Sequence, residues 1–184
     1  MLFVANTSFA DLLNKVKISG NDRISKETII VFSKLNKIKK DVTNLSPNDL
    51  NNILKNLYST NFFKEVEVKV ENNFLKIKVA ENPILQTITI NGIKKNEIVE
   101  ILRENTLLRE KNSFIKSRVK NDEQKILNIL KSNGYYFAEV TSKIKENNNN
   151  SVDLIFDVNL GDKAYIKKIK FIGDKKLKDR KLKS

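Results

Sequence analysis

The stretch Ile88-Thr89-Ile90-Asn91-Gly92 is the middle one of three copies of a short pattern. The other copies are Val16-Lys17-Ile18-Ser19-Gly20 and Ile169-Lys170-Phe171-Ile172-Gly173. Each copy alternates apolar residues with other residues and ends in glycine, which predicts a short strand with one buried face. Glycine suits a tight turn after the strand because it adopts positive φ without steric cost. We therefore expect structural turns at Gly20, Gly92 and Gly173.

The spacing of the copies, 72 and then 81 residues, predicts the domain organisation. It is too long for a solenoid repeat and suits small successive domains. The chain of 184 residues is therefore expected to contain two complete units, residues 11–83 and 84–161, and the start of an incomplete third unit over 162–184. Each complete unit is large enough for a modest core, and no disulfide supports it because the sequence has no cysteine.

Residues 1–10 are apolar at their start and end in Ser8-Phe9-Ala10, a step that resembles the end of a secretory signal peptide. The positive start and most of the apolar core of such a signal are missing. The segment is therefore expected to be a signal-peptide remnant, with an ordinary unstructured start as the alternative. No apolar run in the sequence approaches the length of a membrane-spanning helix.

The first unit is predicted to run strand, helix, helix, strand, strand. Alternation over residues 12–18 indicates the opening strand, and Ser25 can cap the first helix. Ser46 followed by proline marks the second helix, because proline suits the first helical position. Beyond that helix the apolar period changes to alternation, which predicts two strands joined by a turn at Asn72-Asn73. The helical core positions would be Ile29, Ile30, Phe32, Leu35, Leu50, Ile53, Leu54 and Leu57.

The second unit repeats this order. One helix is expected to carry Ile98, Ile101 and Leu102 on its apolar face. The next helix and the strand after it match the first unit in register, apart from one inserted residue. The matching residues are Ile126, Leu127, Leu130, Ser132, Tyr135, Glu139 and Val140, against Ile53, Leu54, Leu57, Ser59, Phe62, Glu65 and Val66. The predicted class is α+β, with a three-stranded mixed sheet and two helices on one face in each unit.

The net charge of +13 raises the question of a nucleic-acid partner, so its distribution matters. Residues 11–83 carry 13 basic and 9 acidic side chains, residues 84–161 carry 12 and 10, and residues 162–184 carry 10 and 3. More than half of the excess thus lies in the last segment. The two complete units are nearly balanced, which argues against a phosphate-binding face and predicts no nucleic-acid partner.

The residue types present also narrow the possible chemistry. With no histidine and no cysteine, the chain has no imidazole base, no thiol nucleophile and no ligands for a His- or Cys-based metal site. Glu65 and Glu67 share a strand face and could form a catalytic pair, but the lysines beside them favour an ordinary solvated face. We expect no enzyme activity, no cofactor and no metal.

Aromatic residues gather where the second helix of each unit is followed by a strand. They are Phe62, Phe63, Tyr135, Tyr136 and Phe137. We expect them to be core residues that join helix to sheet, with base-stacking platforms as the alternative. The basic run from Lys175 to Lys181 fits the solvated start of a truncated helix as well as a binding patch.

The predicted topology leaves one strand edge open in each unit. The first strand arrives through a long connection and the last two form a hairpin, so the final strand can lie in the middle and the hairpin's first strand outermost. We expect these edge strands over residues 64–70 and 137–144. An extended peptide can add itself to such an edge by main-chain hydrogen bonds, which is β-augmentation. The candidate client-binding residues are Glu65, Val66, Glu67, Val68, Lys69, Val70, Phe137, Glu139, Val140 and Ile144.

The repeated order of elements, with its opening strand and glycine, resembles the POTRA domain. The matching segments are residues 16–25, Val-Lys-Ile-Ser-Gly-Asn-Asp-Arg-Ile-Ser, and residues 57–66, Leu-Tyr-Ser-Thr-Asn-Phe-Phe-Lys-Glu-Val. The second segment is the more specific, because its helix end, aromatic residue and Glu-Val recur in register in the second unit. The resemblance extends over about residues 12–181.

Isoleucine-rich tandem units behind a signal peptide most resemble the POTRA region of outer-membrane protein assembly factors. The resemblance implies a place on the periplasmic side of the outer membrane of a Gram-negative bacterium. The implied partners are unfolded outer-membrane proteins, periplasmic chaperones and accessory lipoproteins, with clients passed to a C-terminal membrane β-barrel that is absent here. TamA-type translocation factors and two-partner secretion transporters are alternatives, whereas the single POTRA unit of the division protein FtsQ fits less well.

Overall fold

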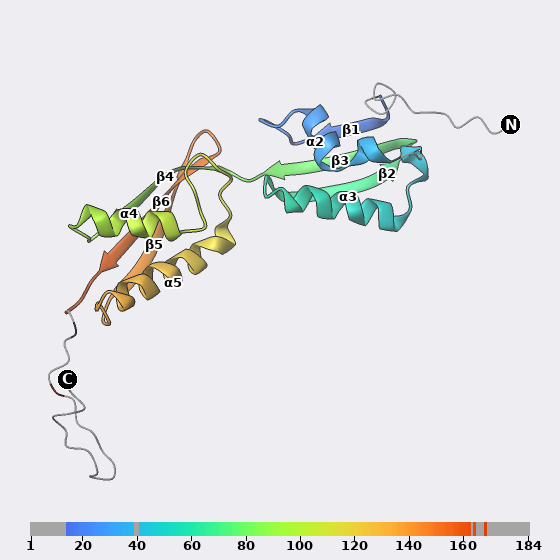
Figure 1. The fold of residues 1–184 in the computed structure, drawn as a ribbon. Helices are drawn as coiled ribbons and strands as arrows, with labels where there is room; N and C mark the ends of the chain where they lie inside the picture. The colour runs from blue at the N-terminus through green and yellow to red at the C-terminus, as the bar shows by residue number, and fades with distance from the viewer. Residues whose placement is uncertain (1–13, 39–40, 163, 165–167, 169–184) are drawn as a thin grey trace, which may run out of the picture.

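The computed structural model describes residues 14–38, 41–162, 164 and 168. In this part of the chain two three-stranded sheets follow one another, and in each unit the helices lie against one face of the sheet (Figure 1). The strand order is β1-β3-β2 in the first sheet and β4-β6-β5 in the second. The predicted α+β class, with a mixed sheet in each unit, is confirmed.

From Val16 to Glu81, the described residues of the first unit form three strands, two α-helices and two short 3₁₀ helices. In chain order these are β1 (Val16–Ser19), α2 (Lys26–Phe32), η1 (Leu35–Lys37), η2 (Val42–Asn44), α3 (Pro47–Ser59), β2 (Phe63–Glu71) and β3 (Phe74–Glu81). The central strand β3 is parallel to β1 and antiparallel to β2.

Both helices of this unit begin where the sequence predicts. Ser25 caps α2 by accepting a hydrogen bond from the Thr28 backbone N–H. Ser46 caps α3 by accepting from the Asp49 backbone N–H, and the Asp49 carboxylate accepts from the Ser46 backbone N–H in return. These reciprocal bonds satisfy N–H groups that have no partner inside the helix.

The opening strand is shorter than predicted. Asn14 and Lys15 are helical, so β1 begins at Val16, and Leu12 lies outside the described residues. Lys15 instead places its ammonium 2.5 Å from the Asp41 carboxylate. The prediction was based on the alternation of apolar residues over 12–18. A contact between residues so far apart in sequence cannot be recognised from that local pattern.

The second unit repeats the order, with a longer connection between its helices. Its elements are β4 (Ile84–Asn91), α4 (Asn96–Asn105), α5 (Lys116–Ser132), β5 (Glu139–Asn147) and β6 (Ser151–Asn159). Leu102 of α4 is fully buried and Ile98 packs against the same core, but Ile101 is 47% exposed. Ile98 and Leu102 are four residues apart and therefore lie on the same side of α4, which faces the core. The prediction that Ile101 shares this face is wrong.

The glycines that follow β1 and β4 are required by both conformation and space. Gly20 and Gly92 have φ of +79° and +88°, values that side chains with a Cβ rarely adopt. A Cβ at Gly92 would lie 1.8 Å from the carbonyl oxygen of Val158, and one at Gly20 would lie 2.0 Å from that of Val79. The predicted turns at these two positions are confirmed, and Gly173 lies outside the described residues.

The aromatic residues at the helix-to-strand junctions divide between core and surface. Phe63 is buried in the first core, and Tyr135 packs partly against the second. Phe62, Tyr136 and Phe137 are 38%, 62% and 68% exposed, so the prediction that all five are core residues is wrong for these three. Phe62 and Phe63 are successive residues of extended backbone, so their side chains point to opposite sides, whereas Tyr136 and Phe137 lie in the turn before β5.

Several predicted features lie outside the described residues. They are the signal-peptide remnant, the basic run from Lys175 to Lys181, and the third unit except for residues 162, 164 and 168. Within the described ranges, none of the helices combines the length and apolar character needed to cross a membrane. The acidic side chains of the same ranges form no group of three suited to holding a metal ion.

Candidate functional site: the edge strands

The first strand of each hairpin lies at a sheet edge, as the topology argument predicts. Among the described strands, β2 pairs only with β3 and β5 pairs only with β6. Asn72 and Asn73, with φ of +51° and +61°, form the predicted turn between β2 and β3. The second edge strand begins at Glu139, so the inclusion of Phe137 in it is wrong: this residue lies in the turn that precedes the strand.

The two sides of these edge strands have opposite character. The residues that pack against the helices and core are Val66, Val68 and Val70 in β2, and Val140 and Ile144 in β5. On the other side, Glu65, Glu67 and Lys69 are exposed as predicted, and Glu139 is exposed as well. The predicted alternation is confirmed.

One hydrogen bond shows which way the backbone of β2 points. The Val66 N–H donates to the Tyr58 hydroxyl (3.1 Å), which belongs to α3 and not to the neighbouring strand. Because backbone groups alternate along a strand, the N–H groups of Val68 and Val70 also point away from β3. The strand register supports the same direction. Glu71 pairs with Phe74 across the two-residue turn, so its N–H points toward β3, and the N–H of the preceding residue, Val70, points away from it.

A helix side chain occupies the edge of β5 in a similar way. The Ser142 hydroxyl donates to Glu123 Oε1 on α5 (2.6 Å), and the Ser142 backbone N–H donates to the same carboxylate. Lys120 Nζ lies 2.6 Å from Glu123 Oε2. Burial raises the pKa of Glu123, but the hydrogen bonds from Lys120 and Ser142 outweigh it and hold this pKa below its ordinary value.

Tyr58 and Glu123 are therefore edge-capping residues, each satisfying one outward N–H of an edge strand. Between each capped residue and the hairpin turn, further backbone N–H groups point away from the sheet. They belong to Val68 and Val70 in β2 and to Ile144 in β5. Neither cap was predicted from the sequence. The one sequence feature that the two residues share is a polar group next to the apolar face of a helix, and many surface residues that contact no strand have the same feature.

The opposite edge of the second sheet is covered by the connection between α4 and α5. Leu85 of β4 donates its N–H to the Asn112 carbonyl (2.9 Å) and accepts from the Lys111 N–H (2.7 Å). Further along β4, the Ile88 N–H donates to Glu110 Oε1 (2.7 Å). In the first unit the opposite edge strand, β1, has only four residues. The nine-residue strands β2 and β5 are thus the edges best suited to pairing with an extended chain.

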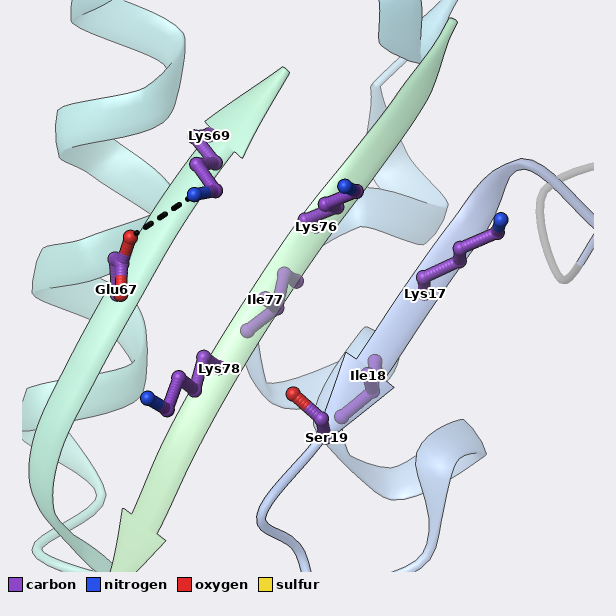
Figure 2. A pocket seen from close by; sticks show the side chains of 8 residues that line it. All are labelled: Lys17, Ile18, Ser19, Glu67, Lys69, Lys76, Ile77 and Lys78. Atoms are coloured by element: carbon purple, nitrogen blue, oxygen red, sulfur yellow. Dashed lines mark ion pairs between the residues drawn. The ribbon is translucent and has the colours of Figure 1, made fainter. Parts of the chain in front are cut away.

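The outer face of the first sheet forms a shallow hollow of about 280 Å³ (Figure 2). Lys76 and Lys78 of β3 lie in its middle, with Glu67 and Lys69 of β2 on one side and Lys17 of β1 on the other. Lys69 Nζ lies 3.5 Å from Glu67 Oε1. The charged groups form rows across the strands and do not converge on one point, as groups acting together on a substrate would.

The outer face of the second sheet has acidic residues on its central strand. Asp153 accepts a hydrogen bond from the Thr87 hydroxyl (2.7 Å), and Asp157 accepts one from the Asn91 side-chain amide (2.9 Å). Lys143 Nζ lies 2.7 Å from Asp157 Oδ2. The bond from Thr87 lowers the pKa of Asp153, the Lys143 ammonium lowers that of Asp157, and Asp157 in turn raises the pKa of Lys143.

The sequence of the second unit matches a known family. Residues 83–161 match the POTRA family model, which is described as a surface antigen variable number repeat. This match covers the segment from β4 to β6, so the second unit is similar in sequence to POTRA domains. The first unit has the same order of elements, the same strand order and the same glycine turn.

Relatives of the whole chain come from one kind of protein. The chain is 28% identical over 189 residues to the outer membrane protein assembly factor BamA of Neorickettsia risticii (strain Illinois), covering 100% of this chain and 24% of that protein. It is 26% identical over 185 residues to BamA of Neisseria meningitidis serogroup B, covering 99% and 23%. The chain thus spans about a quarter of the length of these curated relatives. The predicted resemblance to the POTRA region of BamA is confirmed.

Solved structures include a similar fold. The N-terminal domain of Omp85 from Thermosynechococcus elongatus aligns with 14% identity and a TM-score of 0.46, covering 80% of this chain and 61% of that one.

Proposed function

We propose that this chain is a non-catalytic POTRA module on the periplasmic side of the outer membrane. In this proposal it receives unfolded outer-membrane proteins at β2 and β5 and passes them to a β-barrel elsewhere in a longer protein. Periplasmic chaperones and accessory lipoproteins are its further partners. The observation that supports the proposal best is the pair of nine-residue edge strands, in which the outward N–H groups of Val68, Val70 and Ile144 belong to residues with half-buried apolar side chains.

An extended client would add itself to such an edge through its main chain. It would accept hydrogen bonds from the N–H groups of Val68 and Val70 and donate to their carbonyl oxygens. Its side chains on the helix side would cover these valines, which pack only partly against the first core. Because the backbone bonds need no particular side chain, one edge can serve many clients that share only an extended conformation.

A proline scan of the outward donors tests this proposal. In the full-length parent, Val68→Pro removes an outward N–H and Ile144→Pro removes its counterpart in β5. Capture of an unfolded outer-membrane protein, measured by site-specific crosslinking, should fall several-fold in each variant. The matched controls Val68→Ala and Ile144→Ala remove similar apolar surface but keep the N–H, and should retain most capture. If folded proline variants capture clients normally, the units are better regarded as spacers that hold accessory proteins.

Salt dependence separates this proposal from binding to a nucleic acid. Capture by backbone pairing should change little when the salt is raised from about 50 to about 200 mM, whereas binding through several phosphates would weaken by about a thousandfold or more. A steep loss of binding with salt would therefore favour a polyanionic partner.

A further inference from the structure

The two edge strands carry opposite charge on their solvent-facing sides. On β2 this side presents Glu65, Glu67, Lys69 and Glu71, which gives one positive and three negative charges, a net of −2. On β5 it presents Glu139, Thr141, Lys143 and Lys145, which gives two positive charges and one negative, a net of +1.

The central strands show the reverse arrangement. In the first sheet, Glu67 lies opposite Lys78 of β3 (Figure 2), and Glu71 Oε2 lies 2.7 Å from Lys76 Nζ. In the second sheet, Lys145 lies opposite Asp153 of β6, and Lys143 pairs with Asp157. Apart from Lys69, which lies opposite Lys76, these charged residues of the edge strands are therefore complementary to charges on the strand on their inner side. A strand added on the outer side of an edge strand would meet the same side chains and experience the same preference.

We propose that the two edges select client segments of opposite charge, an inference that rests on the proposed function. The β2 edge prefers an extended segment whose apolar residues alternate with basic residues on the solvent side. The β5 edge prefers a segment in which the alternating residues are acidic. Charge thus decides which unit holds a given strand of an unfolded client.

The size of the preference follows from cross-strand pairing. Side chains directly opposite each other on adjacent strands lie about 5 Å apart, and opposite charges there attract while like charges repel. Lysines of a client opposite Glu67 and Glu71 form two favourable pairs, and acidic residues at the same places form two unfavourable ones. At exposed positions each pair changes binding by about twofold, so the four differences together should make basic and acidic segments differ by about tenfold at β2. Exposed pairs are screened, so the difference should shrink as salt is added.

The test uses two peptides of about eight residues, a strand's usual length, one alternating valine with lysine and the other valine with aspartate. Binding to the 184-residue chain is followed by the backbone amide NMR shifts of Val68 and Val70 for the β2 edge, and of Ile144 for the β5 edge. The lysine peptide should saturate the β2 amides at about tenfold lower concentration than the aspartate peptide. The order should be reversed at Ile144, with a smaller ratio because the net charge there is smaller.

A charge reversal on the edge provides the decisive variant. Glu67→Lys with Glu71→Lys should invert the preference at β2 and leave β5 unchanged. The matched control is Glu27→Lys with Glu100→Lys, which changes the net charge equally at two exposed helical positions away from both edges. This control should keep the wild-type preference.

The possible outcomes separate this inference from the proposed function. If an alternating valine–serine peptide binds both edges as tightly as the charged peptides do, the charge preference is wrong and β-augmentation stands. If no peptide shifts the Val68 or Ile144 amides, the edges do not pair with extended segments and both proposals fail. If sedimentation shows that the chain self-associates, and the Val68 and Ile144 amides shift with protein concentration, the opposite charges serve self-association and the client preference is overturned.

Discussion

The two units share one fold but fix equivalent positions with different chemistry. The Val79 carbonyl lies against Gly20 and the Val158 carbonyl lies against Gly92, so the two valines occupy equivalent positions. Two residues after each valine, Glu81 of the first unit is therefore equivalent to Leu160 of the second. The strand edges differ in the same way, because a phenol caps β2 and a carboxylate caps β5. The POTRA order of elements therefore depends on the glycine turn and the apolar alternation, while polar contacts at matching places can be exchanged.

The Glu81 carboxylate is the clearest of these differences. Its side chain is fully buried and accepts hydrogen bonds from the backbone N–H groups of Asp22, Arg23 and Ile24, each at 3.0 Å. Arg23 Nε donates to its other oxygen at 2.9 Å. The carboxylate thus holds the turn between β1 and α2, whereas in the second unit Leu160 packs partly against the apolar core. Burial raises the pKa of Glu81, but these hydrogen bonds outweigh it and lower that pKa.

The largest effect is expected at the shared glycine turn. Gly92→Val should lower the free energy of unfolding of the second unit by about 2–4 kcal/mol, since it combines an unfavourable positive φ with overlap on the Val158 carbonyl. Urea unfolding of the second unit, followed by its amide NMR signals, measures this loss. Thr89→Val is the control, because Thr89 is exposed on the same strand. Equal stability of the two variants would contradict the role given to Gly92, and the first unit should remain native in both.

A smaller and pH-dependent effect is expected at Glu81. Glu81→Gln should destabilise the first unit by about 1–3 kcal/mol at neutral pH, because hydrogen bonds to a buried charge are lost. A carboxylate with a depressed folded pKa adds stability above its unfolded pKa of about 4.3, and this stability is lost as the pH falls through the folded pKa. The difference in unfolding free energy between wild type and variant should therefore shrink below about pH 4. A difference that stays constant from pH 7 to pH 3 would show that the charge of Glu81 does not hold the turn.

The smallest effects are expected at the two caps. Tyr58→Phe should reduce the hydrogen-exchange protection of the Val66 amide by about fivefold, the effect of one ordinary hydrogen bond, and the reduction should be the same at neutral pH and at about pH 3. Glu123→Gln should reduce protection of the Ser142 amide at neutral pH, and this effect should fade as the pH falls below the ordinary glutamate value of about 4.3 and through the lowered pKa of Glu123, where the wild-type carboxylate also becomes protonated. Tyr136→Phe, at an exposed position outside the strands, should change neither amide. Identical pH behaviour of the two caps would contradict the distinction between phenol and carboxylate.

Much of the fold could be predicted because its determinants are local. Ser25, Ser46 and Asn72-Asn73 fix helix starts and a turn through bonds within a few residues, and the glycine turns require one residue type. Predictions based on periodicity alone went wrong where a neighbour decides the outcome. Ile101 fits the spacing of an apolar helix face, but it is exposed because only a narrow part of the α4 surface, which includes Leu102, is buried in the core.

The candidate site was predictable in its topology but not in its chemistry. The placement of β2 and β5 at the edges follows from connection lengths and hairpin geometry, which a sequence reveals. The caps at Tyr58 and Glu123 depend on how α3 and α5 cross their sheets. The cover over β4 depends on the path of the connection before α5. These are long-range packing features, and no spacing in the sequence encodes them.

The central claim is that extended clients pair with the outward backbone of β2 and β5. Amide hydrogen exchange of Val68, Val70 and Ile144, measured with and without an unfolded outer-membrane protein, tests this most directly. The account predicts that these outward amides gain protection when the client is present, because its carbonyl oxygens accept their hydrogens. If the client binds while these three amides exchange as fast as in its absence, and protection appears only elsewhere in the two units, the claim is contradicted.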